Sequence, residues 1–274
     1  LPSTITSIGN YAFNGCSSLT EVSLPPSLTV IKSYTFSRCT TLKKVAVPAQ
    51  TTRIEDYAFY ECSSLTNVTI PKSVTSLGNG AFSKCESLAK LAIPNTIPTI
   101  GENTFNGCTS LQAIEIPYSV STLGSYAFAN CSSLTSLFIP SSIKTMGTAV
   151  FKKCISLTKV TIKAELKSIN DSLFMGCSSL VDIVYPPSVA SYDKNAFFGC
   201  SSLIEFEIPP TIKKIGPYAF SNCTSLMKMT IPDSVTSIGL HAFKGCTHLI
   251  EISLSKDTEI GKEAFPTNTV VIKK

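Results

Sequence analysis

The sequence predicts an α/β repeat protein, a single right-handed, curved solenoid of about twelve coils with a parallel β-sheet on its concave face. Phenylalanine recurs every 23 residues from Phe13 to Phe243, and Phe265 follows one residue early. A cysteine stands three residues after each of the first eleven phenylalanines, and a leucine three residues after each cysteine. A fixed period of this length is typical of a solenoid, in which each repeat forms one coil that stacks on the last.

Each repeat is expected to contain two extended pieces. In residues 19–25 apolar and polar side chains alternate, which is the period of a strand that buries one face. Proline ends this strand in most copies, because it has no amide hydrogen to give to a ladder. A second extended piece, such as residues 120–123, is followed by glycine in eight of twelve copies. We expect this glycine to allow a positive φ or a close approach of neighbouring backbones.

The A-F-x-x-C segment that follows, residues 12–16 in the first copy, has the spacing of one helical turn. We therefore predict short helical or 3₁₀ segments on the convex side of each coil. A few copies depart from the pattern: Thr51 stands where an apolar residue is expected, and Met146 and Tyr192 replace the usual isoleucine or leucine. These departures predict small bends or local repacking.

The repeat L-x-x-V-x-I-P-x-S-V resembles the leucine-rich repeat L-x-x-L-x-L-x-x-N-x-L, with Ser27 or Ser73 in the place of the asparagine. Extended through I-G-x-x-A-F-x-x-C-x-S-L, the unit resembles the BspA-like class of leucine-rich repeats over essentially the whole chain. The resemblance implies a leucine-rich-repeat fold. It further implies a surface protein of a bacterium or parasitic protist that attaches to host cells or to matrix proteins such as fibronectin, and it supplies no catalytic residues.

Residues 1–274 are expected to form one leucine-rich-repeat solenoid, with 266–274 as a reduced terminal coil. This last segment lacks the cysteine and the leucine but keeps an apolar strand, residues 270–272, before two lysines that protect an open edge. The chain begins in the middle of a repeat, which predicts a fragment of a longer protein. Open ends leave two routes to an oligomer, end-to-end contact or contact through the concave face.

All eleven cysteines share one repeat position and are predicted to stack inside the solenoid as small buried hydrophobes. Parallel side chains on neighbouring coils point the same way, which disfavours disulfides. Metal sites use clustered ligands, whereas no two cysteines here are closer than 23 residues. A catalytic thiol would be singular and close to a histidine, but His241 and His248 stand near one end and are expected at the surface.

The composition narrows the function further. A net charge of +5 from scattered lysines does not indicate nucleic-acid binding, and no apolar run is long enough to insert into a membrane. The chain contains no paired-carboxylate motif, no nucleophile motif and no phosphate loop, since nearly every notable residue recurs in each copy. We therefore expect a protein that is not an enzyme and needs no cofactor.

One asymmetry along the repeat marks a candidate partner-binding surface. The residue after the repeat leucine is polar, charged or alanine in the first seven copies and apolar in the last four. With the outward strand positions Phe138 and Val184, the candidate residues are Phe138, Val181, Val184, Ile204, Met227 and Ile250. Contiguous exposed apolar surface often marks a partner site. The alternative is a strand edge tucked under a neighbouring loop, where apolar side chains only improve packing.

The favoured function is a non-catalytic protein-binding module that uses its concave face. The resemblance makes this a cell-surface or secreted adhesin that engages a host-cell or matrix protein. The alternative is an intracellular or structural interaction scaffold, which eleven unpaired thiols would suit in the reducing cytoplasm. A signal peptide or membrane anchor in the full-length protein would favour the first.

Overall fold

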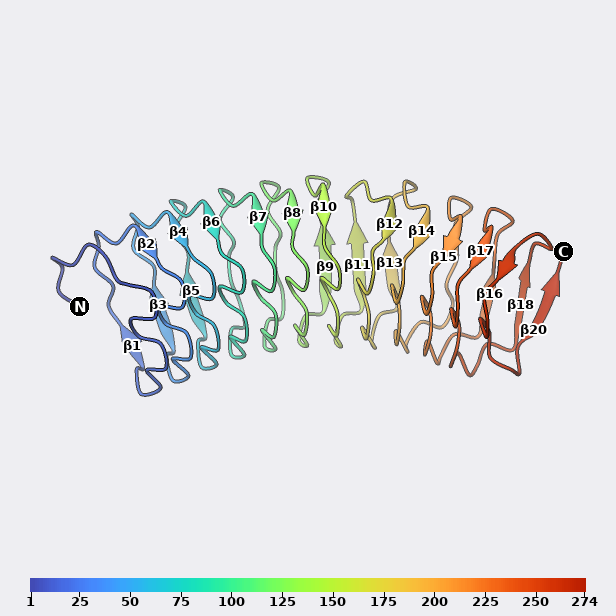
Figure 1. The fold of residues 1–274 in the computed structure, drawn as a ribbon, viewed down its shortest axis with the longest axis horizontal. Helices are drawn as coiled ribbons and strands as arrows, with labels where there is room; N and C mark the ends of the chain where they lie inside the picture. Colours follow the sequence, from blue (N-terminus) through green and yellow to red (C-terminus); the bar gives the residue numbers. More distant parts are fainter.

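The computed structural model describes residues 1–274 as one bowed stack of coils (Figure 1). Most coils contribute to two parallel ladders, in which a strand pairs with its equivalent in the next coil. Glu21 pairs with Lys44, for example, and Val30 with Arg53, each 23 residues apart. The predicted parallel-strand solenoid of stacked coils is therefore confirmed.

The first ladder is formed by the strand that follows the repeat leucine. It falls into three sheets, ordered β1-β3-β5, β9-β11-β13 and β16-β18-β20. The strands are β1 (Glu21–Val22), β3 (Lys44–Ala46), β5 (Asn67–Thr69), β9 (Ser136–Ile139), β11 (Lys159–Ile162), β13 (Asp182–Val184), β16 (Lys228–Thr230), β18 (Glu251–Leu254) and β20 (Val270–Lys273). The ladder is thus interrupted twice. We call residues 88–116 the early break and residues 203–208 the late break.

The second ladder is formed by the short strand that follows the proline turn. Its strands are β2 (Val30–Ile31), β4 (Arg53–Ile54), β6 (Ser76–Leu77), β7 (Thr99–Ile100), β8 (Thr122–Leu123), β10 (Thr145–Met146), β12 (Ser168–Ile169), β14 (Ser191–Tyr192), β15 (Lys214–Ile215), β17 (Ser237–Ile238) and β19 (Glu259–Ile260). In Figure 1 these strands follow the outer rim of the arch, and β9, β11 and β13 lie on its side below that rim. This differs from the concave placement that we predict for the first ladder, so we name the surface the first-ladder face.

The A-F-x-x-C segments are turns, and the predicted helical or 3₁₀ convex segments are wrong. The reason is that alternate amides leave the turn and bond to the next coil. The Tyr57, Phe59 and Glu61 amides donate to backbone carbonyls of residues 79, 81 and 83 at 2.8–2.9 Å. The amides between them, of Ala58, Tyr60 and Cys62, donate within the turn. Positive φ angles at Tyr57 (55°) and Glu61 (57°) produce this alternation.

The core is a column of phenylalanine rings that runs the length of the solenoid. Successive rings stack with centroids 5.2–6.0 Å apart, from Phe13 to Phe265. The column belongs to a single cluster of 78 buried residues that includes the repeat leucines and cysteines. Because every coil buries its apolar side chains against two neighbours, no coil is expected to be stable alone.

Two features let neighbouring coils approach closely: a glycine without a side chain and a hydroxyl that bonds between coils. The repeat glycine has no room for a side chain: a Cβ at Gly124 would lie 2.5 Å from the amide nitrogen of Glu102 in the preceding coil. Close approach, not positive φ, therefore explains this glycine. Hydroxyls in the proline turn donate to a carbonyl of the preceding coil, as Ser119 Oγ does to Ile97 O at 2.8 Å. Thr51, an irregularity of the sequence, is buried and donates in the same way to Leu28 O.

The C-terminal segment adds one more strand to the first ladder. Strand β20 pairs with β18 over four residues, from Glu251 with Val270 to Leu254 with Lys273. Its apolar side chains are exposed, and Val270 is 60% accessible. Phe265 stacks on Phe243 despite its shifted position, with ring centroids 5.4 Å apart. The structure contains no helix long and apolar enough to cross a membrane.

Candidate protein-binding surface

The repeated thiols are structural. Ten of the eleven cysteines are buried, as predicted; Cys16 is exposed, which corrects the prediction for the first coil, because no coil precedes it in the stack. Each buried thiol donates to the carbonyl of the phenylalanine 26 residues earlier, as Cys62 Sγ does to Phe36 O at 3.0 Å. Burial raises the pKa of Cys39 to about 11 and that of Cys108 to about 12. These thiols are therefore poor nucleophiles at neutral pH, since the thiolate is the reactive form.

The two histidines differ in their surroundings. His248 is exposed, as predicted, and its Nδ1 lies 2.6 Å from the Thr224 carbonyl oxygen. His241 is only partly exposed, which corrects the prediction, and its Nε2 lies 2.9 Å from a carboxylate oxygen of Glu263. Lys244 contacts the same carboxylate at 3.1 Å. The group is an ordinary cross-coil ion pair near the C-terminal end.

Four of the six candidate residues form one line on the first-ladder face. Val181, Ile204, Met227 and Ile250 occupy the same position of four consecutive coils, and each is more than half exposed. Neighbouring coils are joined along this line by backbone bonds, such as that from the Met227 amide to Ile204 O at 3.1 Å. Tucking under a loop would bury these side chains. Their exposure leaves a continuous apolar row, which we call the apolar line.

Phe138 and Val184 lie apart from this line. Both align with Thr161 in the ladder, so the three residues form a second line on the same face. Phe138 is 44% exposed and Val184 47%. The structure therefore brings Val184 close to the apolar line in the coil of Val181, whereas Phe138 lies two coils away across the polar Thr161.

A charged line separates the two. Its members, in coil order, are Lys159, Asp182, Glu205, Lys228 and Glu251. Strand pairing or a single bridge aligns each neighbouring pair except Asp182 and Glu205. Lys159 Nζ lies 2.9 Å from the Asp182 carboxylate. The pair is exposed and contributes little to stability. Charges of both signs thus lie beside the apolar line.

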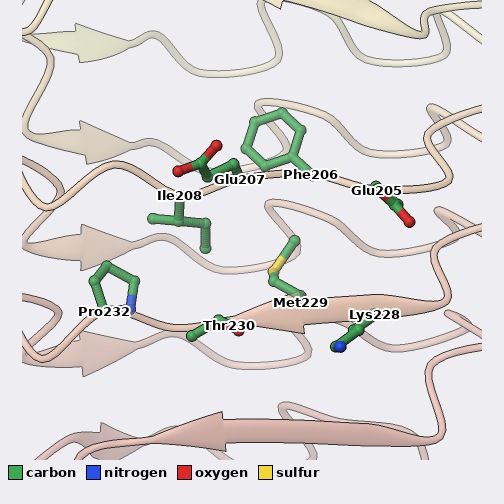
Figure 2. Close-up of a pocket in the computed structure, with 8 residues that line it drawn as sticks. All are labelled: Glu205, Phe206, Glu207, Ile208, Lys228, Met229, Thr230 and Pro232. Carbon is green, nitrogen blue, oxygen red and sulfur yellow. The ribbon is translucent and has the colours of Figure 1, made fainter.

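Two grooves open beside this surface at the late break. The first, of about 470 Å³, lies between β13 and the segment 205–209, and Val181, Val184 and Phe206 contribute to its lining. The second, of about 380 Å³, lies between residues 205–208 and β16 (Figure 2). Figure 2 shows Phe206 and Ile208 on one segment and Met229 on the neighbouring strand. Residues 205–208 keep only one bridge to the ladder, from Glu205 to Lys228, which leaves room for both grooves.

An aromatic insertion accompanies the late break. Tyr192 replaces the usual aliphatic residue of the second ladder, and its ring stands nearly perpendicular to Phe197 and Phe220 of the column. Phe206 occupies the inward strand position and lies 5.0 Å from Phe220 and 5.9 Å from Tyr192 between ring centroids. The hydroxyls of Tyr185 and Tyr192 bond to each other, and burial raises the pKa of both. The coils themselves stay together, because Tyr192 pairs with Ile215 in the second ladder and the Phe197 and Phe220 centroids are 5.2 Å apart. We infer that the extra aromatic volume interrupts only the first ladder.

In the same coils the hydroxyls of the proline turns do not form the cross-coil hydrogen bond seen elsewhere. Ser188 Oγ and Thr211 Oγ1 are buried and have no hydrogen-bond partner. Sequence reasoning noticed Tyr192 but missed the grooves and the failed bonds. The available signal was the group of aromatic residues at 185, 192 and 206, three positions that are aliphatic in most copies.

Comparison with known proteins agrees with this architecture. The pattern described as a BspA type leucine rich repeat region, six copies long, matches residues 1–105, 75–203 and 167–273. No curated protein sequence is significantly similar to this chain.

Solved bacterial structures share the fold. A leucine-rich repeat protein from Bacteroides ovatus is 25% identical with a TM-score of 0.54, over 97% of this chain and 87% of that one. A leucine rich cell surface protein from Faecalibacterium prausnitzii is 28% identical with a TM-score of 0.58, over 93% and 86%. The pneumococcal vaccine antigen PcpA is 25% identical with a TM-score of 0.50, over 82% and 57%. With the whole sequence matched by the repeat pattern, the chain belongs to the BspA-type leucine-rich repeat family.

Proposed function

We propose that this chain is a non-catalytic protein-binding module and that it contacts its partner through the first-ladder face around the late break. The observation that carries the proposal is the apolar line, four exposed apolar side chains on consecutive coils beside two grooves. Exposed apolar surface of this kind costs free energy in water, and a partner that covers it would recover that cost. The charged line beside it supplies polar contacts at the rim of such an interface.

We further propose that the module is part of a cell-surface or secreted adhesin and that its partner is a host-cell or matrix protein. The support is the family and the similarity to a protein described as a leucine rich cell surface protein. The buried thiols do not favour the alternative of an intracellular scaffold, because burial protects them in either compartment.

The test is binding of the chain to epithelial cells and to surfaces coated with fibronectin, laminin or collagen. The variant Ile204→Glu/Met227→Glu/Ile250→Glu places three carboxylates in the apolar line. We expect it to bind at least about tenfold more weakly, because each carboxylate would have to be desolvated at the interface.

The repeat offers a matched control. Thr66→Glu/Gln112→Glu/Thr135→Glu adds the same charge at the equivalent exposed position of earlier coils. It should bind like the native chain once both variants are shown to be folded by circular dichroism. Equal loss in both variants, or no binding of the native chain to any of these targets, would contradict the proposal.

A further inference from the structure

A second candidate site lies away from the first-ladder face, on the A-F turns of the N-terminal third. The residue before A-F has a positive φ in every coil, and in the first three coils it is a tyrosine. The rings of Tyr11, Tyr34 and Tyr57 stack almost parallel, with centroid distances of 4.8 and 5.1 Å. The next coil has Gly80 at this position, and the one after has Asn103. The tyrosine stack therefore ends at Tyr57.

A groove lies beside the end of the tyrosine stack. The Tyr57 ring packs directly on Gly80, where a Cβ would overlap its Cε1 atom. Tyr60 stands perpendicular to Tyr57, with ring centroids 5.7 Å apart. Across the glycine, Asn103 and its bonded neighbour Asn106 face the two rings from the next coil. The resulting groove has a volume of about 480 Å³.

Arg38 and Lys84 complete the lining, and Glu61 holds both of them from beside the groove. Glu61 accepts from Arg38 Nε at 3.1 Å and from Lys84 Nζ at 2.7 Å, so three coils are linked by one carboxylate. The hydrogen bond from Lys84 lowers the pKa of Glu61, which keeps the carboxylate ionised as an acceptor. Lys84 Nζ also lies 5.3 Å from the centre of the Tyr60 ring. The Nη atoms of Arg38 take no part in this ion pair and can serve a ligand.

The backbone shows that these charged residues are held at some cost. Arg38, Glu61 and Lys84 all have φ angles of 57–60°. In five other coils the same position is glycine, which adopts this conformation without strain. A residue with a Cβ disfavours this conformation. Three consecutive coils thus place a charged side chain where glycine would be easier, and two of these side chains, Arg38 and Lys84, line the groove.

The combination of groups selects one ligand chemistry. The partly exposed rings of Tyr57 and Tyr60 can pack against the C–H face of a sugar ring, while the asparagine amides and basic side chains of the lining bind its hydroxyls. A lipid would need a deeper apolar pocket, and a nucleic acid would meet a central carboxylate with only two cations around it. We propose that the groove between Tyr57, Tyr60 and Asn103 binds a pyranose unit of a glycan.

The test uses a printed array of glycans that end in galactose, N-acetylglucosamine, mannose, fucose or sialic acid. The native chain should bind a subset of them. The variant Tyr57→Gly/Tyr60→Ser should bind that subset at least about tenfold more weakly. Both new residues occur at equivalent positions of the neighbouring coil, as Gly80 and Ser83, so the fold should tolerate them. Matched sialylated and desialylated glycans show whether Arg38 and Lys84 select an acidic sugar.

Three further variants make the result specific. Tyr126→Gly removes an equivalent tyrosine outside the groove and should leave binding unchanged. Asn103→Ala, which spares both rings, should weaken binding by itself. The first-ladder variant Ile204→Glu/Met227→Glu/Ile250→Glu should keep full glycan binding, so the two surfaces can fail independently. The inference is overturned if no glycan is bound, if the double tyrosine variant binds as well as the native chain, or if Tyr126→Gly loses as much.

Discussion

The two breaks in the first ladder interrupt the same backbone element but lie over different cores. At the early break the phenylalanine column continues undisturbed, and Phe105 stacks between Phe82 and Phe128 at 5.8 and 5.3 Å. At the late break the column is equally continuous, with Phe197 and Phe220 5.2 Å apart, but Tyr192 and Phe206 pack against its side at steep angles. An interrupted ladder therefore does not require a disturbed core, and the late break is a local property of its aromatic residues.

The surfaces beside the two breaks differ as well. The early break has a groove of about 520 Å³ next to β5, and the residues after its repeat leucines are Ala89 and Gln112. At the late break that position carries Ile204 and Met227, both more than half exposed. Apolar surface and altered core coincide only at the late break. This coincidence is the reason to place a partner there and not at every opening of the ladder.

The largest expected effect is a loss of stability at high pH, which tests the buried thiols that both regions share. The thiol column passes both breaks unchanged, with Cys108 bonded to Phe82 O and Cys223 to Phe197 O, each at 3.2 Å. Burial raises the pKa of these thiols above the ordinary value of 9.0. The native state thus holds protons that the unfolded chain releases. Their stabilisation is complete below about pH 9 and is lost as the pH rises towards the native pKa, about 12 for Cys108.

Each buried thiol should contribute up to about 1.4 kcal/mol per pH unit in that range. The urea midpoint should therefore be nearly constant from pH 7 to 8.5 and fall steeply above pH 9. Tyrosines with raised pKa values add to the same trend, so the control is Cys131→Ala/Cys154→Ala, which should show a shallower slope above pH 9. An identical slope in this variant would show that the thiols are not responsible.

The next effect separates the two cores directly. Phe105→Leu removes a ring from the regular column and should lower the free energy of unfolding by about 2 kcal/mol, because a cavity remains between two stacked neighbours. Phe206→Leu puts in the residue that Leu91 and Leu137 supply at the same position, and it should cost less than about 1 kcal/mol. Urea unfolding monitored by circular dichroism measures both. An equal loss in the free energy of unfolding for both variants would mean that Phe206 is packed as well as the rings of the column and does not cause the interruption of the first ladder.

The repeat made most of the fold predictable. Strict spacing of phenylalanine, cysteine and leucine fixed the coil length, the strand position and the burial of ten thiols. The turns were missed because the A-F-x-x-C spacing fits a helical turn equally well. What the spacing cannot show is that alternate amides bond to the next coil, an arrangement that arises only once the coils are stacked.

The candidate surface was predictable in part for a related reason. Outward apolar residues can be read from one strand, and Val181, Ile204, Met227 and Ile250 are all exposed. The grooves depend on contacts among Tyr185, Tyr192 and Phe206, which come from three segments of two coils. A period of 23 aligns equivalent residues, but it gives no direct information on contacts between different positions of the repeat.

The smallest expected effect concerns one serine hydroxyl near the early break and the equivalent one near the late break. Ser119 Oγ near the early break donates to Ile97 O, whereas Ser188 Oγ near the late break is buried without a partner. Ser119→Ala should lower the free energy of unfolding by about 1 kcal/mol, since a cross-coil hydrogen bond is lost. Ser188→Ala removes an unsatisfied buried group and should be neutral or stabilise by up to about 1 kcal/mol.

Matched urea titrations of the two serine variants measure this difference, with Ser142→Ala as a second regular position, where Oγ donates to Val120 O at 2.8 Å. Ser119→Ala and Ser142→Ala should agree with each other and differ in sign or size from Ser188→Ala. If Ser188→Ala destabilises as much as the other two variants, the native Ser188 hydroxyl is hydrogen-bonded in solution. The proline turn at the late break is then bonded like the turns of Ser119 and Ser142. The comparison of Ser188→Ala with the two regular positions thus tests the backbone at the late break while its aromatic residues remain unchanged.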